Sequence, residues 1–295
     1  MSETESLSPY LNWDYVPELR EPYMVVGFYG WSDAGNVSSD TLEYLKETLQ
    51  PRVFARLTQE PFINYTMDRP IGQIQDGLIS HIEPMVTEFS FWSNPEGPND
   101  LVLVLGKEPH FNWGLYSHIL ISALRRLSVK RLYTIGGVQD TVTHSVPPYI
   151  SMVGSSAAVI AEIVALDEGI EPADYSGPVS IHSFLVRQSM DSGIESVSLW
   201  GHAPPYLQKN PRLVAKLVSI LNNATGMQCP IDLMIRKSVE LDRRINDILS
   251  KDPNLKQFVQ SIEGKKGDRP TAPDGDKIIR LDNFLRRDSD NDSKT

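Results

Sequence analysis

The chain contains 295 residues, of which 40% are hydrophobic and 22% are charged, and its formal net charge is -10. This composition is ordinary for a soluble globular protein, and no uninterrupted apolar run approaches the roughly 20 residues that span a bilayer. The acidic balance argues against nucleic acid or an anionic membrane as a partner, because phosphate groups are bound by concentrated positive charge.

The N-terminus and the cysteine content indicate the cellular compartment. The sequence begins MSETESLSPYLNW, with acidic residues and no apolar block behind a basic start, which is unlike a secretory signal or a transit peptide. The single cysteine, Cys229, cannot form an internal disulfide, in agreement with a reducing compartment. We therefore expect a cytoplasmic protein.

The segment from Met24 to Asn36, MVVGFYGWSDAGN, gives the strongest structural signal. Its apolar first half predicts a strand buried on both faces, and the small residues that follow predict a turn into a helix over residues 37–49. Apolar runs at residues 101–106 and 131–137 also end in turns, and the first of these precedes a helix expected over residues 113–127. This recurrence of strand, turn and helix predicts a parallel α/β fold.

The rest of the chain completes a domain plan. Weaker patterns predict strands at residues 53–57, 89–92, 149–153 and 195–200, and residues 70–88 show no clear period. After residue 207 the pattern is helical and predicts a helical hairpin appended to the sheet. We expect four parts: a polar, loosely held lead-in (1–22), an α/β core (23–207), a helical subdomain (208–263), and a linker with a short helix and a disordered tail (264–295).

The turn after the first strand is the leading candidate site. Its candidate residues are Gly30, Trp31, Ser32, Asp33, Gly35 and Asn36. Small residues at a helix start let backbone N–H groups approach an anion, but Asp33, Ser32 or Asn36 could instead cap the helix. The spacing lacks GxGxxG and the lysine of a P-loop, so nucleotide binding is not supported.

Three further residues join this candidate site. Asn112 and Trp113 follow the second apolar strand, and His144 follows the third, so all three are expected at the same edge of the sheet. The six histidines form no HExxH or other close pair, so we expect no metal and no cofactor. GxSxG is absent, and a triad of Asp140, His144 and Ser155 rests only on common residue types.

Five motifs in sequence order resemble the proteasome assembly chaperone 2 family, in its bacterial and archaeal branch. They are GWSDAG at 30–35, Arg69-Pro70, GKEPHFNW at 106–113, Gly136-Gly137 followed by Thr143-His144, and SLWGHAPPYL at 198–207 followed by Asn210-Pro211. The resemblance covers residues 20–260. It implies a phosphorylase/hydrolase-like three-layer α/β/α sandwich with a mostly parallel central sheet, a helical C-terminal addition and self-assembly into rings or small oligomers. It implies no catalytic residue.

Two functional hypotheses follow. The first is a non-enzymatic assembly or interaction protein that acts as a homo-oligomer and binds a proteasome-like or other protein complex. The second is a small-molecule-binding protein or a hydrolase- or phosphorylase-type enzyme, with a cleft formed by residues 30–36, Asn112, Trp113 and His144. Fold alone does not decide between them.

Overall fold

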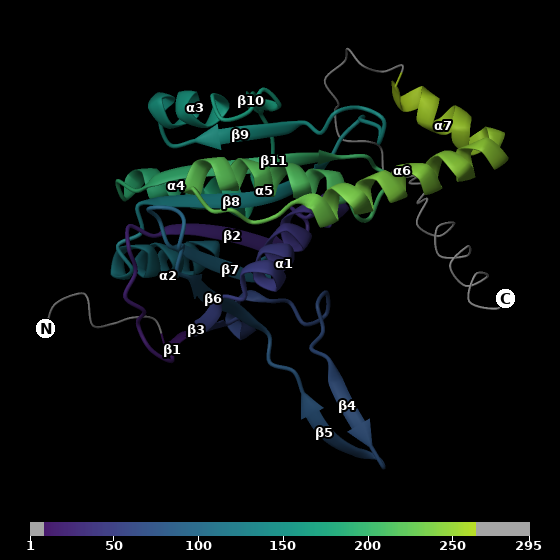
Figure 1. Ribbon diagram of the computed structural model, residues 1–295. Helices are drawn as coiled ribbons and strands as arrows, with labels where there is room; N and C mark the ends of the chain where they lie inside the picture. Colours follow the sequence, from purple (N-terminus) through teal and green to yellow (C-terminus); the bar gives the residue numbers. More distant parts are fainter. Residues whose placement is uncertain (1–8, 264–295) are drawn as a thin grey trace, which may run out of the picture.

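The apolar runs of the sequence form the centre of a nine-stranded sheet with the strand order β1-β3-β6-β7-β2-β8-β11-β9-β10 (Figure 1). The computed structural model describes residues 9–263. The strands of the large sheet are β1 (Leu11–Trp13), β2 (Tyr23–Tyr29), β3 (Arg52–Thr58), β6 (Val86–Trp92), β7 (Leu101–Lys107), β8 (Arg131–Gln139), β9 (Ile150–Gly154), β10 (Ile170–Pro172) and β11 (Glu195–Ala203).

The four central strands β7, β2, β8 and β11 are parallel, which confirms the predicted α/β class. Val25 of β2, for example, lies between Leu103 of β7 and Tyr133 of β8. Strands β6, β3 and β1 continue the sheet antiparallel on one side, and β9 is antiparallel to β11 on the other. Strands β2 and β7 are mostly apolar because helices bury both of their faces.

Helices on the two faces of the sheet produce three layers (Figure 1). Side chains of α1, α3 and α5 share one core cluster, and those of α2 and α4 belong to the cluster on the opposite face. The helical segments are η1 (Ala34–Asn36), α1 (Val37–Leu49), η2 (Glu60–Phe62), α2 (Trp113–Arg126), α3 (Ala157–Val164), α4 (Ile181–Asp191), α5 (Pro211–Thr225), α6 (Asp232–Lys251) and α7 (Pro253–Glu263).

The C-terminal helices divide between the core and an extension. Helix α5 packs on α1 and β11, so its apolar face belongs to the main core. Helices α6 and α7 reach beyond the sheet and share a smaller cluster with Tyr206 and Leu207 (Figure 1). The helices expected after residue 207 are present, with α5 in the main core and most buried side chains of α6 and α7 in the smaller cluster.

Several short elements escaped the sequence patterns. Within the expected loose lead-in, β1 pairs with β3, and Leu11 lies opposite Leu57. Residues 70–88 contain a second, two-stranded sheet made of β4 (Gly72–Gln75) and β5 (Leu78–Ile82), which projects from the body (Figure 1). Strands of three residues are too short to show a period, and every residue of this hairpin is exposed, so no buried face imposes alternation.

Two further observations concern the chain as a whole. Within residues 9–263 no helix is both long and apolar enough to cross a membrane. Cys229 is 2% exposed in the main core, where burial raises the pKa of its thiol to about 11. The expected linker, short helix and tail at 264–295 lie outside the described residues, and the division of the chain into domains stays a prediction.

Candidate functional site

The backbone of the candidate turn between β2 and α1 requires glycine at two positions. Gly30 has a φ of 153°, and a Cβ atom there would lie 2.7 Å from the Cβ of Glu108. Gly35 has a φ of 63°, and its Cβ would lie 2.8 Å from that of Ala203. Asn36 adopts the left-handed region with a φ of 50°. The turn is thus shaped by close approach to neighbouring strand ends.

Asp33 caps helix α1, which is the alternative to ligand binding that the sequence left open. One carboxylate oxygen accepts hydrogen bonds from the backbone N–H groups of Ser38 at 2.8 Å and Ser39 at 3.0 Å. The other accepts from the Ser39 hydroxyl at 2.6 Å. Burial raises the pKa of Asp33 to about 6, against the opposing effect of these bonds. The N–H groups that could hold an anion already have a carboxylate of the chain itself.

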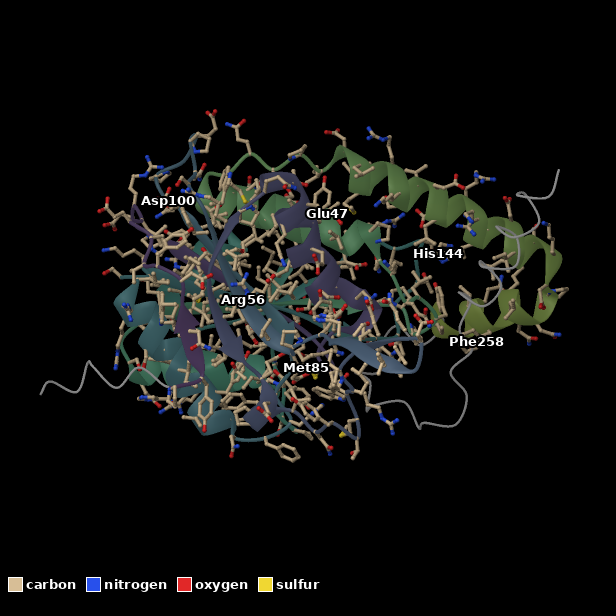
Figure 2. All side chains as sticks on the ribbon, turned by 90° about the horizontal axis from the view of Figure 1, so that it is seen from below. Glu47, Arg56, Met85, Asp100, His144 and Phe258 are labelled. Atoms are coloured by element: carbon tan, nitrogen blue, oxygen red, sulfur yellow. The ribbon has the colours of Figure 1, made fainter. Side chains whose placement is uncertain are left out.

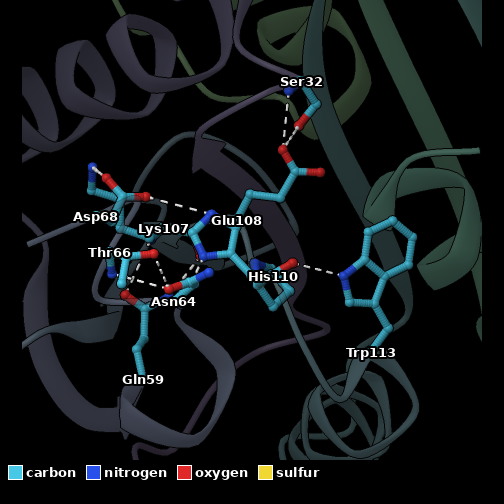
Figure 3. Close-up of polar contacts among 10 residues, drawn as sticks. Ser32, Gln59, Asn64, Thr66, Asp68, Lys107, Glu108, His110 and Trp113 are labelled. Carbon is cyan, nitrogen blue, oxygen red and sulfur yellow. Dashed lines mark hydrogen bonds and ion pairs between the residues drawn. The ribbon is translucent and has the colours of Figure 1, made fainter.

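Ser32, Glu108 and His182 form a group that we call the buried cluster. The Ser32 N–H and hydroxyl each donate to one Glu108 carboxylate oxygen at 3.0 Å, and Figure 3 shows both contacts. His182 Nε2 lies 3.0 Å from the same hydroxyl. The exposed fractions of the three residues are 1%, 7% and 0%. Neither glutamate nor histidine was singled out by the sequence reasoning.

The chemistry of the buried cluster is structural. Burial lowers the pKa of His182 to about 3, so its imidazole is neutral, and its Nδ1 has no hydrogen-bond partner among the described residues. The rings of Phe28 and Trp200 lie 5.3 and 5.2 Å from it. A catalytic serine needs a histidine oriented by the carboxylate, whereas here the carboxylate binds the serine.

The other candidates near this edge have separate tasks. Asn112 precedes α2 and donates its side-chain amide to the Pro61 carbonyl at 2.9 Å, while the Trp113 indole N–H donates to the Pro109 carbonyl at 2.7 Å (Figure 3 shows the second contact). Trp31, by contrast, is 74% exposed. Trp113 therefore fixes its own loop, and Trp31 is the tryptophan that is free to meet another molecule.

His144 lies in a different pocket, next to the helical extension (Figure 2). Its Nδ1 is 2.9 Å from the Tyr206 hydroxyl and its Nε2 is 3.5 Å from the Asn246 side chain. Arg212 donates to the His144 carbonyl at 2.7 Å and forms an ion pair with Asp242. The pocket encloses a volume of about 20 Å³, and the rest of its space is open to solvent. His144 therefore contacts Tyr206, α5 and α6 rather than the β2–α1 turn.

The triad considered from the sequence does not form. Asp140 binds His202 rather than His144, with 2.7 Å between Oδ2 and Nδ1. The Ser155 hydroxyl accepts from the Ser196 N–H at 3.0 Å. Within residues 9–263 no three His, Cys, Asp or Glu side chains are grouped so that they could hold a metal ion.

Comparison with solved structures places the fold among proteasome-assembly chaperone relatives. The chain is similar to a PAC2 family protein from Streptomyces avermitilis, with 26% identity and a TM-score of 0.69 over 77% of this chain and 95% of that one. A proteasome-assembly chaperone homologue from Mycobacterium tuberculosis has 23% identity and a TM-score of 0.73 over 80% and 99% of the two chains. An archaeal proteasome activator from Pyrococcus furiosus has 18% identity and a TM-score of 0.66 over 81% and 97%.

The family itself follows from the sequence match. The model of the PAC2 family matches residues 27–249, and the chain belongs to this family. No curated protein matches the chain. The resemblance inferred from the five motifs is confirmed, as is the three-layer fold that it implied.

Proposed function

We propose that this protein is a chaperone-like interaction protein of the cytoplasm, which acts as a homo-oligomer and binds a protein complex of the proteasome type. Membership of the PAC2 family and the likeness to assembly chaperones and a proteasome activator support the chaperone-like role. Self-association is supported above all by the exposed apolar hairpin β4–β5.

The hairpin carries apolar side chains at positions that are exposed to solvent. Four of its aliphatic side chains and that of the preceding residue are 55% to 73% exposed: Ile74, Leu78, Ile79, Ile82 and Ile71. Asp76 and Gly77 both have positive φ, as a type I′ turn requires. A two-stranded hairpin is marginally stable in water, and exposed apolar patches mark interaction surfaces. Burial against a second copy would remove these side chains from water.

The segment that precedes the hairpin is held against the main sheet by polar contacts. Lys107 forms an ion pair with Asp68 at 2.7 Å, and the Asn64 N–H donates to His110 Nδ1 at 2.9 Å (Figure 3). These bonds fix the loop before the hairpin against the end of β7, next to the candidate turn.

The oligomeric state tests this part of the proposal. Light scattering after size exclusion should give a mass above that of one chain for the wild type, and Ile74→Asp with Ile79→Asp should give a monomer. Val239→Asp, at a 63% exposed position on α6, is the matched control and should leave the mass unchanged. A wild type that is monomeric at every concentration would contradict self-association.

The partner surface is proposed at the carboxyl edge of the sheet. Trp31, Phe111 and Val138 follow or end the neighbouring strands β2, β7 and β8, and they are 74%, 49% and 36% exposed. Tryptophan is enriched among the residues that dominate protein interfaces. Trp31→Ala should reduce the amount of proteasome subunits retained by the tagged protein at least ~10-fold, whereas Tyr15→Ala should not. A source genome without proteasome genes would exclude that partner.

Small-molecule binding is a second candidate, favoured by the pocket beside His144. Arg212 and Asp242 line this pocket, together with Tyr149 and His202. A thermal-shift screen with phosphate, nucleosides and amino acids tests it, because a ligand that binds only the folded chain raises the melting temperature. A shift that Arg212→Gln removes would support this candidate, and a flat screen would count against it.

A further inference from the structure

Three side chains on adjacent strands are connected in the order that serine hydrolases use. His202 lies on β11, between Ser151 on β9 and Asp140 directly after β8. His202 Nδ1 is 2.7 Å from Asp140 Oδ2, and His202 Nε2 is 2.8 Å from the Ser151 hydroxyl. We call these three residues the edge triad.

The backbone explains why they meet. Ser151 is paired with Trp200 across β9 and β11, and His202 is two residues further along β11, so Ser151 and His202 project from the same face of the sheet. Asp140 is held at the end of β8 by its N–H bond to the Ala203 carbonyl, at 3.0 Å. The Tyr149 ring lies 4.2 Å from the His202 ring and limits its rotation.

The hydrogen bonds assign the tautomer. A carboxylate accepts, so Nδ1 of His202 carries the proton, and the free Nε2 lone pair accepts from the Ser151 hydroxyl. The hydrogen bond with His202 lowers the pKa of Asp140, which keeps the carboxylate charged. A triad is defined by this geometry and these roles rather than by chain order or fold.

The edge triad is largely buried, and its histidine and aspartate are more exposed than its serine. The His202 and Asp140 side chains are 15% and 17% exposed, and Ser151 is 9% exposed. His202 and Tyr149 line the pocket described above. The pocket thus borders the residue that would act as the base, while Ser151 and Asp140 lie outside its lining.

We infer that Ser151, His202 and Asp140 form a nucleophilic site for small carboxylic esters, an activity beyond the chaperone-like role and independent of it. The Ser151 oxygen attacks the ester carbonyl while its proton passes to His202 Nε2. The tetrahedral adduct expels the alcohol, which takes that proton, and leaves acyl-Ser151. Water then gives a proton to His202 and attacks the acyl carbon, which releases the carboxylic acid and returns the proton to Ser151. Ester and water become acid and alcohol.

Acylation is the step to measure. Ser151 lies inside a strand that is paired on both sides, so its backbone N–H lies in the plane of the sheet rather than above the hydroxyl. The Ser151 N–H is thus not placed to stabilise an oxyanion above the hydroxyl. Covalent capture of the serine is therefore a more direct measurement than turnover. A fluorophosphonate reports it, because the serine oxygen displaces fluoride from phosphorus and forms a stable adduct.

The experiment treats the full chain with a fluorophosphonate and maps the adduct by peptide mass spectrometry. One adduct is expected, on Ser151, and Ser151→Ala should abolish it. Ser176→Ala is the matched control, because Ser176 lies in an exposed loop and would react first if accessibility alone decided. Adducts on Ser176, no adduct at all, or full labelling of Ser151→Ala would each overturn the inference.

Two variants separate catalytic from structural roles. His202→Gln keeps an amide that can hydrogen-bond but removes the base, and it should slow labelling at least ~100-fold. Asp140 is a positioning residue, and Asp140→Asn should favour the wrong tautomer. With para-nitrophenyl acetate it should lower the acylation rate at saturation without raising the half-saturating concentration. Unchanged acylation in both folded variants would contradict the assignment, and if either fails to fold, the mapped wild type and Ser151→Ala decide.

Discussion

Two groups of a serine, a histidine and a carboxylate lie near the same edge of this sheet, and they differ in their connections. In the buried cluster the carboxylate of Glu108 binds Ser32, and His182 binds the same hydroxyl. In the edge triad the carboxylate binds the histidine, which binds the serine. The first arrangement gives the buried Ser32 N–H and hydroxyl an acceptor, whereas the second orients a base. Residue types alone therefore do not predict chemistry, because it depends on which group is hydrogen-bonded to which and on access to solvent.

The largest expected effect is the loss of Glu108. Glu108→Ala leaves the Ser32 N–H and hydroxyl without their acceptor in a buried place, and should lower the free energy of unfolding by about 3 kcal/mol. Glu108→Gln keeps one carbonyl oxygen and should cost about 1 kcal/mol. Urea denaturation measures both. Equal losses for the two variants would mean that the acceptor oxygen is not what matters.

The same substitution in the two groups gives the most direct comparison. Ser32→Ala removes a hydroxyl that serves both Glu108 and His182, and should cost about 2 kcal/mol. Ser151→Ala leaves His202 next to solvent and should cost about 0.5 kcal/mol or less. Denaturation curves for both variants test the contrast, which disappears if the losses are similar.

His182 should make the fold sensitive to acid. Its pKa is lowered from 6.5 to about 3, so below pH 6.5 the unfolded chain binds a proton that the folded chain does not. The free energy of unfolding therefore decreases as the pH is lowered from 6.5 towards 3. Asp33 has the opposite sign, because its pKa is raised from 3.8 to about 6 and the folded chain binds that proton first. Stability from Asp33 is thus present below pH 3.8 and lost as pH rises through about 6.

The two titrations can be separated by mutation. The Asp33→Asn variant lacks the titration that opposes that of His182. Its free energy of unfolding should therefore fall by about 2 kcal/mol between about pH 7 and about pH 4.5. Adding His182→Gln should remove most of that slope. Denaturation at several pH values measures it, and an unchanged slope in the double variant would assign the acid sensitivity elsewhere.

The smallest effect concerns the cap of α1. Asp33→Ala removes the acceptor of three hydrogen bonds and should cost about 1 kcal/mol near neutral pH. Asp33→Asn retains an amide oxygen that can accept from the Ser38 and Ser39 N–H groups, and should cost less. If the two variants are equally destabilised, the cap contributes little and the charge matters more.

Much of the fold could be predicted from the sequence because buried strands and amphipathic helices leave periodic patterns. The runs at 24–29, 101–106 and 131–137 all became central strands. The hairpin left no such pattern, although Asp76-Gly77 is a strong turn signal in itself. For the candidate site, the sequence located the β2–α1 turn but not the contacts of Ser32 with Glu108 and His182, which lie 76 and 150 residues further along the chain. Asp140 was named with the wrong partners because strand register, not spacing, brings His202 and Ser151 to it.

The burial of Cys229 has a practical consequence. Its thiol is protonated and enclosed in the core, so thiol-directed alkylating agents meet no reactive thiol in the natural chain. A cysteine introduced at Ile79 would then be the sole addressable thiol. Dyes, spin labels and cross-linkers could be attached at the tip of the hairpin without first engineering a cysteine-free background.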